Sequence, residues 1–587
     1  MQHIIFTEHA ECQYCYKCIS KCPVKAIRFK NNHADIVQKM CVLCGNCIKC
    51  CPKTARRVRP DIENAKKLIK QGGRVVVSLA SSFVSEFCGA KPGQLIAALK
   101  TLGFYAVSET AIGAELISRD IAVSIKNAHD KSSGQKLFLS SVCSAVVLYI
   151  KRYAPSFAQY LNDRASPLLA HAVMLRKLYG KNISVVFAGP CAAKKREADQ
   201  MKEINAALTF NELRQWFDQE NIVPEEIEDS EGEKFVPHNA AKGVLYPLEG
   251  GMFGGIDNYL RENGIADVSF LSISGINNIA DFLKEKPDTA NFKYPLFAQM
   301  LACQGGCVNG DGTLREASDI VRTEKLLSYA KDAENHLTEN RLDDEKAFEK
   351  IKFTGTITAK EVPSVQYSDS EIRSALASIE KFSDKDRINC SMCGYDNCVS
   401  FAKALIDRRA EKTMCSAYLR NMAQRKANAL INTTPSGVVI VDKDLNIIEC
   451  NRNFARLLGK EEEELYELAD QFKGLKLGKF INFTGCFEEA LEANTSDSFN
   501  HDIRVGKKIL HLTTYVIERG EVVAGTLDDI TRPASLRRNT VMRARNIIEK
   551  NVVAVQKIAF LLGENAAETE AILNSIIESH TVEEPEK

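Results

Sequence analysis

The stretch LACQGGC, Leu301 to Cys307, holds two cysteines separated by three residues, two of which are glycines. Two other loops carry one cysteine each: SSVCSA, with Cys143, follows the apolar run LFL, and GPCAAKKRE, with Cys191, follows ISVVFA. A single cysteine at the end of a strand is more often a packing residue than a ligand. Four cysteines on three glycine- or serine-rich loops indicate instead a shared bulky inorganic group. The glycines that would let backbone approach it closely are Gly305, Gly306, Gly310 and Gly312.

The sequence around these loops predicts an α/β domain between Arg74 and Val365. The runs VVVSLA (75–80), ISVVFAG (183–189) and VSFLSISG (268–275) have the composition of buried strands, each running into a loop. GQLIAALKTLGF (93–104) has helical spacing between them. In α/β domains the chemistry lies on loops that follow strands, and three such loops carry the cysteines.

Length, charge and cysteine content limit the class of protein. The 587 residues suggest three to five domains, and the net charge of +1 gives no electrostatic case for a nucleic-acid or membrane partner. The 20 cysteines are too clustered for a disulfide framework and indicate metal binding in a reducing cytoplasm. The start, MQHIIFTEHAEC, lacks the features of a signal peptide, and no run of about 18 apolar residues occurs. We expect a cytoplasmic protein.

Two runs near the N-terminus, C-QY-C-YK-C-ISK-CP (12–23) and C-VL-C-GN-C-IKC-CP (41–52), have the spacing that binds two 4Fe-4S clusters. Residues 1–60 resemble bacterial two-cluster ferredoxins, in which each cluster takes three thiolates from one run and the fourth from the other. The first cluster is expected to use Cys12, Cys15, Cys18 and Cys51, and the second Cys41, Cys44, Cys47 and Cys22. The alternative is a pair of zinc knuckles. Cys50 is left over and is predicted to be a small packed residue.

A third group follows near residue 400, with the ligand set Cys390, Cys393, Cys398 and Cys415. The segment VSFAKALIDRRAEKTM has apolar residues at helical spacing, so a helix is expected to return Cys415 towards the other three. Four thiolates suit either 4Fe-4S or zinc. The spacing resembles a small iron-sulfur module of reductive electron-transfer proteins, and we predict a 4Fe-4S cluster.

From about residue 72 to 365 the chain resembles the FeFe hydrogenases. That family has a TSCCPxW-like, an MPCxxKxxE-like and an ExMACxGGC-like loop, and the matching segments are Ser140–Val146, Gly189–Glu197 and Gln299–Cys307. The resemblance implies an H-cluster, a 4Fe-4S cube joined to a di-iron unit that bears CO, cyanide and a bridging dithiolate. It also implies dihydrogen and protons as reactants, and a ferredoxin or other redox protein as partner.

On matching positions, the resemblance assigns the site residues. Cys143, Cys191, Cys303 and Cys307 would hold the cube, and Cys307 would also bridge to the di-iron unit. Lys194 would donate a charge-assisted hydrogen bond to a cyanide ligand, and Met252 in EGGMFGG would pack beside the di-iron unit.

Several departures from the family pattern bear on proton transfer. Val142 stands where active enzymes have a proton-passing cysteine, and Phe253 stands where a relay glutamate is usual. Ser166 in RASP matches a relay serine, whereas Gln299 and Leu301 replace a glutamate and a methionine near the cluster. General acid-base steps contribute about two to four orders of magnitude. We therefore expect cofactor binding with slow turnover.

Residues 425–532 resemble a PAS sensory domain: two strands, a helix opening at Asn451, a polar loop and three further strands. No PAS ligand can be identified, and a surface or core role for His501 and His511 is favoured over haem ligation. Further on, an apolar stripe of the coiled-coil kind predicts a packed helix or a homodimer contact. The stripe is Ile548, Val552, Val555, Ala559 and Leu562. A shorter helix and a disordered tail are expected after it.

The sequence thus predicts a multidomain α/β protein. Its segments are a ferredoxin-like α+β domain (1–60), an α/β hydrogenase domain (61–365), a helical 4Fe-4S module (366–424), a PAS α+β domain (425–532) and C-terminal helices (533–587). The leading hypothesis is a sensory FeFe hydrogenase that signals to a downstream protein. The alternatives are an ordinary ferredoxin-linked hydrogenase and a non-enzymatic iron-sulfur protein without the di-iron unit. Cys88, Cys450 and Cys486 are predicted only to fill space.

Overall fold

The computed structural model describes residues 3–30, 33–130, 134–161, 165–229, 232–285, 289–314, 317–335, 355, 357–493, 498–506 and 508–531. The chain divides into two compact units, Met1–Glu411 and Lys412–Lys587. The helices predicted after residue 532 lie outside the described residues. Within the described ranges, no helix is long and apolar enough to cross a membrane.

The N-terminal region is a small α+β structure built from two antiparallel strand pairs. Strand β1 (Ile5–Thr7) pairs antiparallel with β4 (Arg56–Val58), and β2 (Ile27–Lys30) pairs antiparallel with β3 (His33–Ile36). Each cysteine run contains one short helix: α1 (Lys17–Ser20) in the first and α2 (Asn46–Lys49) in the second. The first run lies between β1 and β2 and the second between β3 and β4, so each run connects one strand pair with the other.

A four-stranded parallel sheet forms one half of the central domain. Its order is β6 (Ala106–Glu109), β5 (Val75–Leu79), β8 (Ser184–Gly189) and β9 (Ala206–Thr209). All five residues of β5 are buried because helices cover both faces of the sheet. The helices α3 (Ile62–Lys70), α5 (Pro92–Thr101) and α10 (Phe210–Gln219) pack on one face. The helices α6 (Thr110–His129) and α8 (Pro167–Tyr179) pack on the other.

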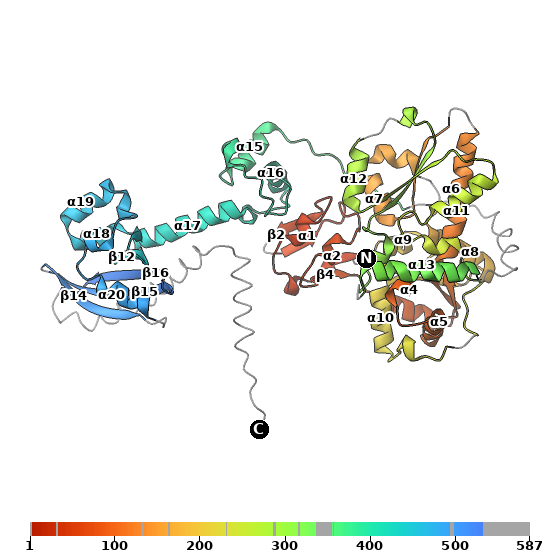
Figure 1. Cartoon of the computed structure of the whole chain (residues 1–587), viewed down its shortest axis with the longest axis horizontal. Helices are drawn as coiled ribbons and strands as arrows, with labels where there is room; N and C mark the ends of the chain where they lie inside the picture. The colour runs from red at the N-terminus through yellow and green to blue at the C-terminus, as the bar shows by residue number, and fades with distance from the viewer. Residues whose placement is uncertain are drawn as a thin grey trace, which may run out of the picture. The chain divides into compact units, whose positions relative to one another are not determined.

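A second parallel sheet, of order β10 (Ser269–Ser274), β11 (Leu296–Leu301) and β7 (Leu137–Leu139), forms the other half. The helices α7 (Ser144–Tyr153) and α12 (Ile276–Glu285) cover one face, and α11 (Phe253–Glu262) packs with α6 on the other (Figure 1). The prediction of a buried strand at 268–275 is wrong in one respect. Strand β10 lies at the sheet edge, and Leu271 is 37% exposed.

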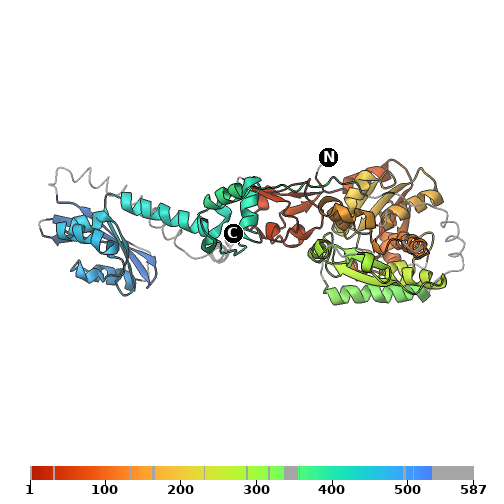
Figure 2. The ribbon, with the colours of Figure 1, turned by 90° about the horizontal axis from the view of Figure 1, so that it is seen from above.

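The helix α13 (Asp319–Asn335) runs along the outside of the central domain, where it is drawn green in Figure 2. Two shorter helices follow, α15 (Asp369–Ala377) and α16 (Cys398–Ile406). The helix predicted between Cys398 and Cys415 is therefore shorter than expected. Arg408, two residues after α16, has a left-handed φ of 56°, which an α-helix cannot accommodate in its interior.

The second unit contains α17 (Ser416–Thr433) and an antiparallel five-stranded sheet (Figure 1). The sheet order is β13 (Ile447–Cys450), β12 (Gly437–Asp442), β16 (Val522–Asp529), β15 (Lys508–Glu518) and β14 (Phe499–Val505). Asn451 caps α18 (Arg452–Leu458), as the PAS pattern predicts, because its Oδ1 accepts from the Phe454 amide at 2.9 Å. The predicted polar loop is wrong, since it holds α19 (Lys460–Leu468) and α20 (Gly485–Glu492).

Candidate metal centres

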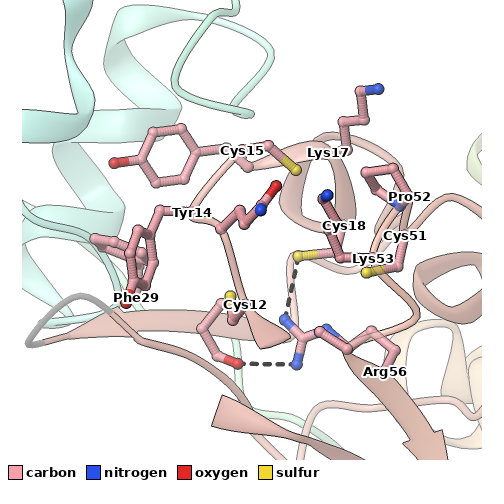
Figure 3. Close-up of a pocket in the computed structure, with 14 residues that line it drawn as sticks. Cys12, Tyr14, Cys15, Lys17, Cys18, Phe29, Cys51, Pro52, Lys53 and Arg56 are labelled. Atoms are coloured by element: carbon pink, nitrogen blue, oxygen red, sulfur yellow. Dashed lines mark hydrogen bonds between the residues drawn. The ribbon is translucent and has the colours of Figure 1, made fainter. Parts of the chain in front are cut away.

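Cys12, Cys15, Cys18 and Cys51 line one pocket of the N-terminal region, as the ferredoxin-like ligand pattern predicts for its first cluster. Figure 3 shows their sulfur atoms directed towards the same space. The Arg56 guanidinium is buried beside them and donates a hydrogen bond of 3.1 Å to Cys18 Sγ. Burial raises the pKa of the Cys18 thiol, and the charge and hydrogen bond of Arg56 act against this rise and favour the thiolate, the form that binds iron.

A second pocket is lined by the other predicted set, Cys22, Cys41, Cys44 and Cys47. Backbone amides of Ala26 and Leu43 donate to Cys22 Sγ at 3.2 Å and to Cys41 Sγ at 3.4 Å. Burial raises the pKa of the Cys41 thiol to about 11, so the free thiol keeps its proton at neutral pH. A coordinating metal removes that proton, and the two amides then face the thiolate charge.

The third set lies in the central domain, at the carboxyl ends of three strands from the two sheets. Cys143 follows β7 and caps α7, Cys191 lies two residues beyond β8, and Cys303 lies two residues beyond β11. Cys307 begins a short 3-10 helix, Cys307–Asn309. Burial raises the pKa of Cys191 well above its usual value, and negative charge on Asp311, Cys143, Cys303 and Cys307 adds to the effect, so these groups lie within electrostatic reach of Cys191.

The glycines of the LACQGGC loop allow the loops to approach one another. Gly306 has a left-handed φ of 95°, and a side chain there would place Cβ 2.2 Å from the Pro247 carbonyl oxygen. The Cys307 amide donates to that same oxygen at 2.7 Å. The packing of Gly306 against Pro247, in the loop before Met252, therefore already accounts for a glycine at this position. The sequence instead predicts that glycine is needed here for close approach to an inorganic group.

A buried carboxylate, Glu197, organises the polar side of this site. Lys194, the first residue of α9 (Lys194–Gln200), places Nζ 2.5 Å from Glu197 Oε1, and Ser144 donates to the same oxygen. Ser166 caps α8 and donates to Glu197 Oε2. Burial alone would lower the pKa of Lys194, but the Glu197 charge outweighs it and raises the pKa. Glu197 is the last residue of the segment GPCAAKKRE, but the sequence analysis assigns it no role.

A group of apolar side chains also lies next to the central cysteines. Val142 is 1% exposed and belongs to one packed cluster with Met252 and Phe297, against which Phe253 also packs. The Phe253 ring lies 5.2 Å from that of Phe270, measured between ring centroids. None of these four side chains can exchange a proton with a bound ligand. These four side chains, called the apolar wall below, include Val142, which directly precedes Cys143.

Tyr246 is a further polar group that the sequence did not single out. Its hydroxyl donates to the Val142 carbonyl at 3.4 Å, and Lys194 Nζ approaches the same oxygen at 3.5 Å. Burial raises its pKa well above the usual value, and the nearby charge of Cys307 adds to the effect, so the phenol stays neutral. In the sequence, only the glycine-rich stretch that follows, EGGMFGG (249–255), marks this region.

Each of the three cysteine sets offers four thiol groups. Among the described residues, no cysteine forms a disulfide. A 4Fe-4S cube takes one thiolate at each of its four irons. In number and kind of donor, the three sets therefore fit iron-sulfur cubes.

Comparison with known proteins identifies the central domain. Residues 73–311 match the family model described as "Iron only hydrogenase large subunit, C-terminal domain". The central domain of this chain is therefore similar to the C-terminal domain of iron-only hydrogenase large subunits. Residues 425–489 match a PAS domain model, and residues 386–417 match a model described as a putative Fe-S cluster.

Individual relatives of the iron-only hydrogenase family are distant. Iron hydrogenase 1 of Clostridium pasteurianum is 22% identical over 329 residues, which cover 48% of this chain and 57% of the relative. The NADP-reducing hydrogenase subunit HndD of Solidesulfovibrio fructosivorans is 23% identical over 372 residues, covering 53% and 62%. This chain therefore spans about three fifths of the length of these two relatives. A solved FeFe-hydrogenase HydA1 structure from Chlamydomonas reinhardtii gives a TM-score of 0.42 at 16% identity, covering 52% of this chain and 100% of that chain.

The departures from the iron-only hydrogenase pattern lie inside the domain core. Gln299 and Leu301, on β11, are buried, and Gln299 Nε2 donates to the Leu248 carbonyl at 3.2 Å. Gln299 thus contacts the loop that leads to Met252, whose sulfur accepts from Ser140 Oγ at 3.9 Å.

The Fe-S segment that follows the iron-only hydrogenase domain also packs on the N-terminal region. Lys25 Nζ donates to the Gly394 carbonyl at 3.1 Å and pairs with Asp396 Oδ1 at 3.1 Å. The matched range includes Cys390, Cys393, Cys398 and Cys415, of which Cys398 begins α16 and Cys415 precedes α17. The assignment of these four to one cluster stays a prediction.

The PAS histidines have ordinary surface partners. His511 Nδ1 lies 2.6 Å from Asp502 Oδ1 across β14 and β15, and His501 Nε2 lies 3.5 Å from Glu489 Oε2. Apolar side chains fill the PAS interior, among them Phe454, Phe472 and Phe487. Cys450 lies in that core and Cys486 at its border. These positions agree with the surface and packing roles that the sequence favoured.

Proposed function

We propose that this protein is a sensory FeFe hydrogenase, which reacts slowly with dihydrogen and reports the result through iron-sulfur clusters to its PAS and C-terminal segments. One observation supports it above all. The site keeps its four cysteines and the buried Lys194–Glu197 pair, yet Val142, Met252 and Phe253 form an apolar wall where protons would have to pass. A site that binds the cofactor but conducts protons poorly suits detection better than flux.

The residues present fit an H-cluster. Cys143, Cys191, Cys303 and Cys307 would hold the cube, and Cys307 would be shared with the di-iron unit. When bound, the group supplies an open iron site that splits dihydrogen into protons and electrons. Lys194, kept cationic by Glu197, would bind an anionic cyanide, because an ammonium donates strong hydrogen bonds to anions.

The chain's own residues would then limit the reaction. Val142 is buried in the apolar wall, and the hydroxyl of Ser166 is bonded to Glu197. A proton released at the site would find no exchangeable side chain at Val142 or Phe253. General acid-base groups contribute about two to four orders of magnitude, so slow turnover follows.

Electrons would leave through the N-terminal region. The set Cys22, Cys41, Cys44 and Cys47 adjoins the central site, since the charges of Cys44 and Cys303 interact. We infer two 4Fe-4S clusters in residues 1–60 and one more in 366–424, exchanging electrons with a ferredoxin or another redox protein. The other segments that we propose are the hydrogenase domain at 61–365, the PAS domain at 425–532 and the C-terminal helices at 533–587. A homodimer through the PAS and C-terminal segments, a downstream signalling protein and a cytoplasmic location complete the proposal.

Two rivals make different predictions. An ordinary ferredoxin-linked hydrogenase would need a second proton route around Val142 and Phe253. A non-enzymatic iron-sulfur protein would bind the cube without the di-iron unit, and it would have no use for the buried cation at Lys194.

A PAS domain that senses its own ligand and controls the hydrogenase site is a further arrangement, in which the signal runs in the opposite direction.

The test is dihydrogen oxidation by the full chain, produced anaerobically with the hydrogenase maturation machinery and assayed with a viologen dye. We expect slow but measurable turnover that is abolished in Cys307→Ser and unchanged in the control Cys88→Ser, whose cysteine lies outside the three sets. Turnover as fast as that of typical family enzymes would contradict the sensory proposal. Equal rates for wild type and Cys307→Ser would contradict a hydrogenase of either kind.

A further inference from the structure

Lys49 joins the N-terminal region to the central cysteine set by a direct contact. It is the last residue of α2, between Cys47 and Cys51 in the sequence, so its backbone lies between predicted ligands of both N-terminal clusters. Its ammonium contacts the central cysteine loop. Nζ lies 3.1 Å from Cys303 Sγ and 2.6 Å from the Asn309 carbonyl oxygen.

The surrounding contact is close enough to fix this geometry. Gly45, which precedes α2, has a left-handed φ of 72°, and a Cβ there would lie 2.2 Å from Cβ of Asp311. The start of α2 therefore packs directly on the loop that carries Cys303 and Cys307. The carbonyl of Asn309 accepts from the same ammonium, so Nζ is held by two contacts with the central domain.

Charges of opposite sign act on Cys303. Burial raises its pKa, Lys49 lowers it through charge and hydrogen bond, and the Asp311 carboxylate raises it. Asp311 is itself fixed, since its Oδ1 accepts from the Ala192 amide at 3.3 Å. Lys49 is thus the cation that offsets the negative charge gathered around this sulfur.

We propose that Lys49 is a positioning residue that sets the reduction potential of the central cube through its hydrogen bond to Cys303. This rests on the proposed function, in which Cys303 holds that cube. Reduction adds one electron and one unit of negative charge to the cube, and a hydrogen bond from a cation to a cluster sulfur stabilises that charge. Because Lys49 belongs to the N-terminal region, the cube has this potential only while that region is docked.

The test is infrared spectroelectrochemistry of the matured full-length protein. The CO and cyanide bands belong to the H-cluster alone, so they follow its oxidation state without interference from the other clusters. Lys49→Met should lower the reduction potential, with about a tenfold lower ratio of reduced to oxidised cube at a fixed potential, or about 59 mV for one electron. Lys49→Gln should shift it in the same direction. Lys49→Arg, which keeps a cationic donor, should stay near the wild-type value.

The matched control is Lys39→Met, which removes the same charge from an exposed lysine of the same region. It should leave the potential unchanged. Wild-type bands with no shift in Lys49→Met, or an equal shift in Lys39→Met, would overturn the inference. Equal potentials for Lys49→Arg and Lys49→Met would also overturn it. A wild-type spectrum without CO and cyanide bands would instead refute the proposed function.

Discussion

Replacing Glu197 with glutamine should destabilise the central domain strongly. The Glu197 side chain is 3% exposed and that of Lys194 is 12% exposed, with 2.5 Å between Oε1 and Nζ. Glutamine removes the charge and turns an amide donor towards the ammonium or towards the hydroxyls of Ser144 and Ser166. Breaking one half of a buried ion pair costs about 3–5 kcal/mol, because the other charge stays buried without compensation.

The single tryptophan of the chain makes this measurable. Trp216 is buried in the core beside β8, so its fluorescence reports unfolding of the central domain alone. With guanidinium m-values of about 2–6 kcal/mol/M, a loss of 3–5 kcal/mol lowers the unfolding midpoint by roughly 0.5–2.5 M. The control Glu262→Gln removes the same charge from an exposed site of this domain and should change stability by less than about 0.5 kcal/mol. A Glu197→Gln midpoint no lower than that of Glu262→Gln would refute the account of this pair.

Three further predictions concern proton transfer, hydrogen bonding and pH. If the missing relay limits the rate, the double variant Val142→Cys with Phe253→Glu should raise the rate of dihydrogen oxidation by about two to four orders of magnitude, and each single variant should raise it by less. A double variant that oxidises dihydrogen at the wild-type rate would count against the relay argument. Tyr246→Phe should shift a cyanide band in the infrared spectrum. The control Tyr329→Phe should not shift it, because the Tyr329 hydroxyl contacts Glu109. Identical spectra for Tyr246→Phe and wild type would exclude a role for Tyr246 at the site. Burial lowers the pKa of His171 to about 3, so below about pH 6.5 the unfolded chain binds a proton that the folded chain does not. The free energy of unfolding of the central domain should therefore decrease as the pH is lowered from about 6.5 to 3. The decrease should be less steep in His171→Gln than in wild type, and equal slopes would show that His171 does not contribute.

The strands that position the site could be predicted because their sequence pattern is local. VVVSLA and ISVVFAG are continuous apolar runs, and such runs form strands that are covered on both faces. The edge position of β10 could not be predicted, because exposure of Leu271 depends on which strand lies beside it. Helices α19 and α20 were missed because acidic residues surround their few buried side chains, Tyr466 in α19 and Phe487 in α20.

The cysteines could be grouped from spacing, whereas their polar neighbours could not. Glu197 receives Ser144 and Ser166 from other helices, and neither contact leaves a pattern in the sequence around residue 197. Lys49 and Cys303 are 254 positions apart, and a lysine within a cysteine run is an ordinary surface residue on local information. These contacts are set by packing between segments, which only the folded chain defines.

The most direct test of the central claim is the infrared spectrum of the full chain after anaerobic maturation. If Cys143, Cys191, Cys303 and Cys307 hold an H-cluster, CO and cyanide bands will be present in wild type and lost in Cys307→Ser. Protein that carries the iron of the predicted 4Fe-4S clusters but shows no such bands would contradict the account.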